Sequence, residues 1–251
     1  MLRENGVSEV HRVPTLQGER ERDPPAAREG ERAPSSSSTS SASRPPMVPF
    51  MLMDLPNLCS LVGLFSALVS LYASCHGAHG ISIIGMLWAV FFDWTDGILA
   101  RQPGRKSKRS KVYQRLGAQL DSQIDIISFG VCPAVFLLSL GHGSIYYMPG
   151  AFIILATAAL RLSYFNVFGL AGGRRYRGLA LDNNILMLSV VYVARRHLPF
   201  YPECVYALQM VLAGLNVSQF EMTKPKGAWY YVLILFCTAV TVTIWYQYHG
   251  Q

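Results

Sequence analysis

The sequence predicts an all-α integral membrane protein, a polytopic bundle of about six to seven transmembrane helices with a disordered N-terminal tail. Of its 251 residues, 51% are hydrophobic and 15% are charged, where an ordinary soluble domain carries roughly 25% charged residues. Residues 1–48 contain equal numbers of acidic and basic side chains, so the net charge of +7 belongs to the rest of the chain. That remainder holds eight acidic residues, too few for a soluble domain of its length.

Residues 1–48 form the predicted tail. They are rich in Glu, Arg, Pro and Ser, and a Ser/Thr/Ala run lies between Pro34 and Pro46. A segment with so little apolar surface cannot offset the entropy cost of folding. We therefore expect a disordered cytoplasmic tail ahead of a membrane domain at 49–251. Because no apolar run follows Met1 until about residue 48, the start of the chain is not expected to be a signal peptide.

Seven apolar segments follow the tail, at roughly 52–75, 80–100, 117–140, 145–168, 180–198, 202–218 and 227–247. A helix needs about 20 predominantly apolar residues to cross a bilayer, and several of the segments come near that length. The fifth and sixth are short and are broken by Pro199 and Pro202. They are expected either as tilted spans or as a partly re-entrant pair.

The basic residues between the segments indicate the orientation. The stretch Arg101–Arg115 contains seven Lys/Arg and no acid. If it is cytoplasmic, alternation of the spans places two more basic groups on the same side: Arg174, Arg175 and Arg177, and Lys224 and Lys226. The positive-inside rule is satisfied at these loops and fails at Arg195 and Arg196. Because orientation explains the basic excess, a nucleic-acid partner is not expected.

Four of the eight acidic residues lie on two helix faces that can meet. Two sets of residues have helical spacing: Asp93, Asp96, Gly97 and Ala100 in the second segment, and Gly117, Asp121 and Asp125 in the third. Each set occupies one face of its helix. A single loop joins the two segments, which makes them antiparallel neighbours. The glycines and the alanine would let the two backbones approach closely.

Four carboxylates at a membrane edge repel one another and are costly to desolvate, and Arg101 alone does not compensate them. Divalent metal ions would compensate the negative charge of these carboxylates. Carboxylate oxygens without neighbouring His or Cys favour Mg²⁺, Mn²⁺ or Ca²⁺ over zinc. Two ions roughly 3.5–4 Å apart would form a clamp for phosphoryl chemistry. The isolated Asp54 and Asp182 are instead expected to be solvated or paired with Lys or Arg.

The motif Asp93-x-x-Asp96-Gly97-x-x-Ala100-Arg101, followed by Gly117-x-x-x-Asp121-x-x-x-Asp125, resembles the signature of the integral-membrane CDP-alcohol phosphatidyltransferases. Further stretches resemble the phosphatidylserine synthase subgroup: Leu120–Asp125, Ser128–Val131, Pro133-Ala134, Arg161-Leu162, Phe165–Val167 and Val217-Ser218. The stretch Pro56–Leu58 with Ser60 resembles the opening of the family's first helix.

The resemblance implies a metal-dependent enzyme that moves the phosphatidyl group of CDP-diacylglycerol to a small alcohol and releases CMP. L-serine is the leading acceptor, and glycerol 3-phosphate and inositol are alternatives. A non-catalytic membrane protein that keeps the fold and binds lipid or nucleotide is a further alternative. The active site would open at the cytoplasmic membrane surface. The Ser-rich tail favours the endoplasmic reticulum or another internal membrane, and a homodimer is compatible with this interpretation.

The resemblance also implies roles for individual residues. Asp93, Asp96 and Asp121 would coordinate Mg²⁺ or Mn²⁺, with two ions expected, and Asp125 would be the general base while also touching metal. The remaining positions follow the same motif: Gly97 and Ala100 would admit the cytidine nucleotide, Arg101 would lie near it, and Gly117 would allow close helix packing.

Two departures from the family pattern concern the loops. Residues 102–116 make a longer and more basic connection than is usual, either as a solvated loop or as a patch for anionic lipid or nucleotide phosphate. The stretch 177–184 lacks the proline expected of bacterial-type serine enzymes and could shape the acceptor pocket.

Three further features are assigned from position. Arg161 lies within an apolar span and should face the site, where a phosphate or a carboxylate would be its partner. Asn166 is a candidate for acceptor recognition. The aromatic run Trp229–Tyr231 is expected to anchor a helix at the membrane interface.

Overall fold

The computed structural model describes residues 54–101, 111–168, 175–218, 221–223 and 228–249, without the side chains of 111–114, 175–177, 221–223, 228 and 249. These residues all belong to the unit Pro45–Gln251. The predicted tail at 1–48, most of the loop 102–116, Arg174, Lys224 and Lys226 lie outside the described residues.

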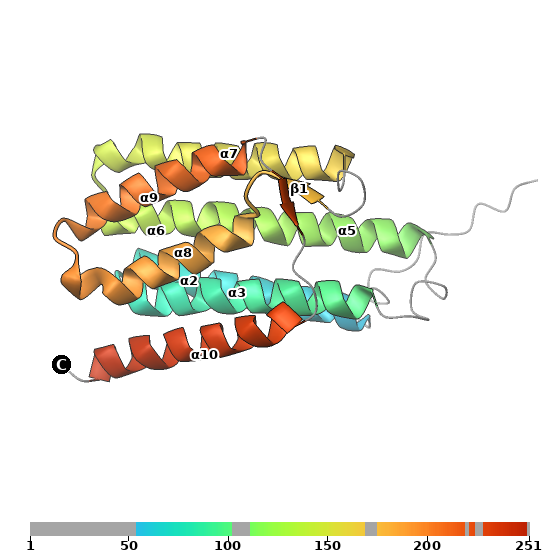
Figure 1. Ribbon diagram of the computed structural model, residues 1–251, viewed down its shortest axis with the longest axis horizontal. Helices are drawn as coiled ribbons and strands as arrows, with labels where there is room; N and C mark the ends of the chain where they lie inside the picture. Colours follow the sequence, from blue (N-terminus) through green and yellow to red (C-terminus); the bar gives the residue numbers. More distant parts are fainter. Residues whose placement is uncertain (1–53, 102–110, 169–174, 219–220, 224–227, 250–251) are drawn as a thin grey trace, which may run out of the picture. The chain divides into compact units, whose positions relative to one another are not determined.

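The described chain forms a bundle of helices that lie side by side (Figure 1). Its long helices are α2 (Leu55–Cys75), α3 (His79–Ala100), α5 (Lys111–Ile126), α6 (Cys132–Leu140), α7 (Met148–Phe168), α8 (Leu181–Val193), α9 (Tyr201–Asn216) and α10 (Ala228–His249). Short helical turns at Ile127–Val131, Ile145–Tyr147 and Ala194–His197 connect some of them. Two short strands, β1 (Arg175–Arg177) and β2 (Glu221–Thr223), complete the described elements.

Five described segments are long and apolar enough to cross a membrane: Leu55–Cys75, His79–Ala100, Arg115–Leu140, Ile145–Phe168 and Trp229–Tyr248. They confirm the predicted all-α membrane bundle. The fifth and sixth apolar segments form α8 and α9, whose 13 and 16 residues fall short of a full span. Leu198 is extended ahead of Pro199, as a residue before proline prefers, and this ends the helical run.

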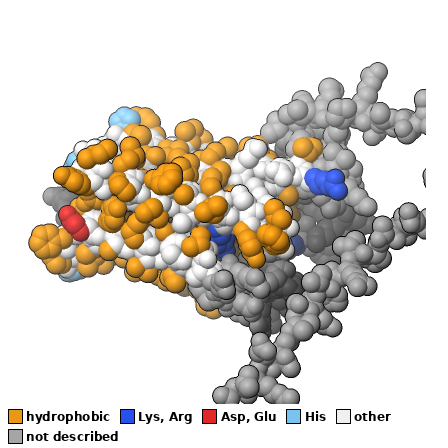
Figure 2. Space-filling view, turned by 90° about the horizontal axis from the view of Figure 1, so that it is seen from above, with side chains coloured by type: hydrophobic (Ala, Val, Ile, Leu, Met, Phe, Trp, Pro, Cys, Tyr) orange, Lys and Arg blue, Asp and Glu red, His pale blue; other side chains and the backbone are white. Residues whose placement is uncertain are grey.

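Large apolar side chains are exposed on the outside of the bundle, as a lipid environment requires. Figure 2 shows one face covered largely by hydrophobic side chains with few charges among them. Phe65, Phe152 and Leu235, from α2, α7 and α10, are each at least 65% exposed. Large exposed apolar surfaces of this kind mark a membrane or an interaction surface, and here they coincide with the candidate spans.

The strands β1 and β2 are a feature that apolar periodicity could not reveal. They pair antiparallel, with Arg175 opposite Thr223 and Arg177 opposite Glu221. The pairing ties the segment before α8 to the segment before α10. Since α8 and α10 both contribute to the site described below, this pairing helps to set the position of its wall.

Arg195 and Arg196, the exceptions to the positive-inside pattern, have structural partners at the end of α10. Arg196 Nη2 donates to the backbone oxygen of Gln247 at 3.0 Å, and Arg195 donates to the side-chain oxygen of Gln247. Arg195 also lies 4.3 Å from the ring centroid of Tyr192. Cations near a helix C-terminus are favoured by the helix dipole. These contacts give both arginines a packing role independent of orientation.

Small residues bring α2 and α3 into close contact. A Cβ on Gly85 would lie 2.8 Å from the backbone oxygen of Ser66 and 2.9 Å from Ser70 Cβ. Nearby, the hydroxyl of Ser82 lies 3.0 Å from that of Ser70 and 2.7 Å from that of Ser74. Helices in membranes associate through such small-residue packing and interhelical hydrogen bonds, and this contact holds the helix that carries Asp93.

We expect Gly85→Ala to destabilise the protein by about 1–3 kcal/mol, because the new methyl group overpacks against backbone that cannot move freely. The matched control is Gly214→Ala in α9, where an added Cβ meets nothing within 4 Å. That control should be neutral or stabilising by up to about 1 kcal/mol. Thermal unfolding of the two purified variants in one detergent measures the difference, and equal melting temperatures would contradict the close α2–α3 contact.

A π-helical turn at Ile127–Val131 interrupts the helix immediately after Asp125. The N–H of Cys132 bonds to the oxygen of Ile127, five residues back. Pro133 explains the change, because proline in a regular helix lacks its N–H and clashes with the carbonyl four residues earlier. A wider turn accommodates the ring, and π-turns of this kind are frequent at functional sites.

Candidate metal centre and substrate cavity

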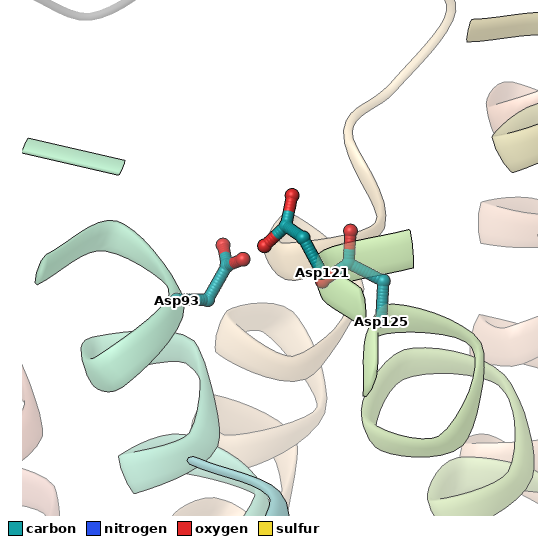
Figure 3. A group of neighbouring side chains, drawn as sticks. All are labelled: Asp93, Asp121 and Asp125. Carbon is teal, nitrogen blue, oxygen red and sulfur yellow. The ribbon is translucent and has the colours of Figure 1, made fainter. Parts of the chain in front are cut away.

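Three carboxylates from two helices converge at one place in the bundle. Asp93 comes from α3, and Asp121 and Asp125 come from successive turns of α5. One carboxylate oxygen of each lies within 4.8 Å of the other two. Figure 3 shows the three side chains projecting into the space between the helices. The predicted meeting of the two acidic helix faces is thus present for these three residues.

Asp96 lies one turn beyond Asp93 and has a different environment. It is 6% exposed, and its Oδ2 accepts a hydrogen bond from the hydroxyl of Ser60 on α2. Within the described residues, the three-carboxylate group does not include Asp96. Asp96 nevertheless lines the same cavity as the other three. Ser60 therefore holds one predicted metal ligand beside the group rather than within it.

The carboxylates open into a cavity of about 1100 Å³. Its polar lining comprises Asp93, Asp96, Asp121, Asp125, Asp182, Asn183, Arg101 and Arg161. Its apolar lining includes Phe129, Leu186, Met187, Val190, Val232, Leu233 and Phe236. The acidic floor therefore comes mainly from α3 and α5, and the apolar wall mainly from α8 and α10.

Other predicted site residues divide into two groups. Gly97, Arg101 and Arg161 line the cavity. Arg101 donates from Nε to the backbone oxygen of Gly97 at 2.7 Å, which holds its side chain against the end of α3. Ala100 belongs to the other group, since it is not among the described residues that line the cavity.

Gly117 and Asn166 also lie outside the cavity lining of the described chain. A Cβ on Gly117 would lie 3.2 Å from Oδ1 of Asn57, so the glycine sits where α5 approaches α2 closely. Asn166 accepts a hydrogen bond from the hydroxyl of Ser122 at 3.1 Å. That contact joins α7 to α5 at the residue that follows Asp121.

Asp182 and Trp94 line the cavity, although neither was predicted from the sequence to belong to the site. Asp182 was expected to be solvated or paired with Lys or Arg, but its Oδ2 accepts a hydrogen bond from the indole N–H of Trp94 at 2.7 Å. The sequence did hold a signal for Asp182, because acidic residues are rare in this apolar region and Asp182 is one of eight. Trp94 had no signal beyond its place beside Asp93 in the motif.

The aromatic residues at the start of α10 cover the cavity as well. Trp229 and Tyr230, expected as interface anchors, both line it. The hydroxyl of Tyr230 lies 3.1 Å from that of Thr95, and its ring stacks on Phe91 with centroids 5.9 Å apart. These contacts fasten α10 to the carboxylate-bearing part of α3.

The charges in the cavity are unbalanced. Five carboxylates and two arginines line it, and like charges held this close destabilise one another. A bound cation would relieve that repulsion. The donor set consists of hard carboxylate oxygens, which fits Mg²⁺ or Mn²⁺ better than a soft or borderline metal. The residues present therefore suit a divalent metal.

Apolar helices around a carboxylate-lined cavity define an integral membrane protein that can receive a charged substrate. Comparison with known proteins makes the class specific. The family model for CDP-alcohol phosphatidyltransferases matches residues 53–249, a range that includes all of the described residues. The chain belongs to the CDP-alcohol phosphatidyltransferase family, a family of metal-dependent membrane transferases of phospholipid biosynthesis.

Individual relatives are serine enzymes by name. The chain is 34% identical to the archaetidylserine synthase of Methanothermobacter thermautotrophicus over 176 residues, which are 69% of this chain and 71% of that protein. It is 35% identical over 100 residues to the CDP-diacylglycerol–serine O-phosphatidyltransferase of Methanocaldococcus jannaschii, and 31% identical over 133 residues to the enzyme of that name from Saccharomyces cerevisiae. These two alignments cover 40% and 49% of this chain and 44% of each relative.

Proposed function

We propose that this protein transfers the phosphatidyl group of CDP-diacylglycerol to the hydroxyl group of L-serine and releases CMP. One observation carries the proposal: Asp93, Asp121 and Asp125 converge in a cavity that also has a large apolar lining. Such a cavity suits a substrate with a diphosphate at one end and acyl chains at the other. The names of the relatives support serine as the acceptor.

The acidic floor would hold the metal. We assign Asp93, Asp96 and Asp121 as ligands of Mg²⁺ or Mn²⁺, with two ions, and Asp125 as the general base that also contacts metal. When bound, the ions neutralise the diphosphate and the charge that develops on the departing CMP. Asp96 needs a supporting partner to serve as a ligand beside its neighbours, and Ser60 supplies one.

The chain's own residues account for binding and for the proton. Gly97 and Arg101 form the part of the cavity that receives the nucleotide, with Ala100 on the same helix face. Arg161 offers a positive charge to a phosphate or a carboxylate. The oxygen of the acceptor hydroxyl bonds to the phosphorus that carries diacylglycerol, and Asp125 accepts the proton of that hydroxyl. The bond from that phosphorus to CMP breaks, and CMP departs.

The apolar wall would receive the acyl chains of the substrate. Met187 and Val190 on α8 and Val232 on α10 line the cavity, and each is about half exposed at 53%, 49% and 53%. Apolar side chains that line the cavity and keep this much accessible surface suit contact with acyl chains.

We place the site at the cytoplasmic face of an internal membrane such as the endoplasmic reticulum. The ends of α3 and α7 and the starts of α5, α8 and α10 lie toward one end of the bundle (Figure 1). The basic stretches of the sequence flank these ends, and positive residues favour the cytoplasmic side. Arg195 and Arg196 remain the exception to this rule, and their contacts with Gln247 give them a packing role instead.

The function is tested with the purified full chain in detergent micelles that contain CDP-diacylglycerol and Mg²⁺ or Mn²⁺. We expect L-serine to stimulate CMP release at least tenfold over an acceptor-free control, and EDTA to abolish the stimulation. Glycerol 3-phosphate and inositol serve as competing acceptors. Stimulation by either of them instead of serine would identify that alcohol as the acceptor. If no acceptor stimulates the release of CMP, the result would support a non-catalytic protein.

A further inference from the structure

Asp182 is a fifth carboxylate of the cavity that the metal centre leaves without a role. It lies in the first turn of α8, where the helix dipole favours a negative charge. It lines the cavity, but within the described residues the group of converging carboxylates consists of Asp93, Asp121 and Asp125. The same cavity therefore holds a carboxylate that is positioned separately from the metal ligands.

The hydrogen bonds of Asp182 orient it without neutralising it. The indole N–H of Trp94 donates to Oδ2 at 2.7 Å, and the backbone N–H of Asn183 donates to Oδ1 at 3.0 Å. Both donors are electrically neutral. A carboxylate oriented by two neutral donors beside a substrate cavity is suited to bind a cationic group through a charge-assisted hydrogen bond.

Trp94 connects this carboxylate to the reaction centre. It follows Asp93 directly on α3, and its bond to Asp182 spans 88 positions of sequence. The contact therefore fixes the start of α8 relative to the helix that bears the three-carboxylate group. A change at Trp94 would loosen Asp182 while leaving its charge in place.

We propose that Asp182 binds the ammonium group of the acceptor and that Trp94 is the residue that positions Asp182. This inference rests on the proposed function and specifies its acceptor as an amino alcohol. Arg161 lines the same cavity and carries the positive charge that would suit an anionic group such as the acceptor's carboxylate. Glycerol 3-phosphate and inositol have no ammonium group, so Asp182 would select against them.

The test compares binding of L-serine with binding of 3-hydroxypropionate, which keeps the hydroxyl and carboxylate but lacks the ammonium group. In the wild type, L-serine should bind at least tenfold more tightly than 3-hydroxypropionate. The two constants to compare are the KM of L-serine and the inhibition constant of 3-hydroxypropionate. Asp182→Asn should bring the two constants within threefold of each other. The amide keeps the size of the side chain and one oxygen acceptor, so the variant removes mainly the charge.

Trp94→Phe tests the positioning role, because it keeps an aromatic ring and removes the indole N–H. We expect the KM for L-serine to rise more than kcat falls, with the affinity for 3-hydroxypropionate nearly unchanged. A shift of melting temperature by L-serine in the presence of Mg²⁺ gives a second measurement that needs no turnover. That shift should be present in the wild type and reduced in both variants.

The possible failures are distinct. If the wild type releases CMP in response to serine but Asp182→Asn retains the tenfold preference, the inference is wrong and the proposed function stands. Equal weakening of serine and 3-hydroxypropionate in that variant also overturns it, because such a loss indicates a structural role. If the wild type shows no serine-dependent CMP release, the proposed function itself fails.

Discussion

Asp125→Asn should lower the rate of CMP release by about 10²–10⁴-fold, the range typical for the loss of a general base. An amide cannot accept the proton of the attacking hydroxyl, whereas its shape and one oxygen are preserved. Metal-dependent binding of CDP-diacylglycerol should persist, because Asp93 and Asp121 remain in the group. Single-turnover CMP release measures the first effect, and stabilisation of the protein by CDP-diacylglycerol with Mg²⁺ measures the second.

The matched control is Glu203→Gln, which removes an exposed carboxylate from the first turn of α9, away from the cavity lining. It should leave both measurements within twofold of the wild type. If Asp125→Asn retains substantial turnover, its assignment as the base is wrong. If the variant loses substrate stabilisation together with turnover, Asp125 serves chiefly as a metal ligand.

The helices could be predicted because the solvent dictates them. A bilayer requires long apolar segments, and five predicted segments became the helices that are long enough to cross it. The π-turn after Asp125 was not predicted, because a hydropathy pattern does not report which carbonyl each N–H reaches. Pro133 was visible in the sequence, but whether it ends, kinks or widens a helix depends on what packs around it.

The carboxylate group could be predicted because the four-residue spacing of Asp121 and Asp125 puts both on one face, and the adjoining helix carries Asp93 on its own polar face. The separate setting of Asp96 could not, since it depends on Ser60, a residue 36 positions away on another helix. The bond from Trp94 to Asp182 likewise joins remote segments. Spacing along the sequence predicts which side chains share a helix face, whereas the hydrogen-bond partners of those side chains depend on tertiary packing.

Asp93→Asn should affect stability in opposite directions with and without metal. Without metal, the variant removes one of three mutually repelling carboxylates, so its melting temperature in EDTA should exceed that of the wild type by about 2–4 °C for each 1 kcal/mol relieved. With Mg²⁺, the wild type should gain stability by ligand binding, and the variant should gain much less. The concentration of Mg²⁺ needed for half-maximal activity should rise at least tenfold.

The informative outcome is that the variant melts above the wild type in EDTA and below it in Mg²⁺. General damage to the fold would instead lower the melting temperature in both conditions. Glu203→Gln again provides the control, since a carboxylate outside the cavity should change neither the EDTA value nor the response to Mg²⁺. A wild-type protein whose melting temperature ignores Mg²⁺ and Mn²⁺ would count against metal at this site. If the order of melting temperatures reverses in this way, Asp93 destabilises the metal-free protein and also binds the ion that removes the repulsion. A cluster of repelling carboxylates in an apolar bundle is then explained by its role as a binding site.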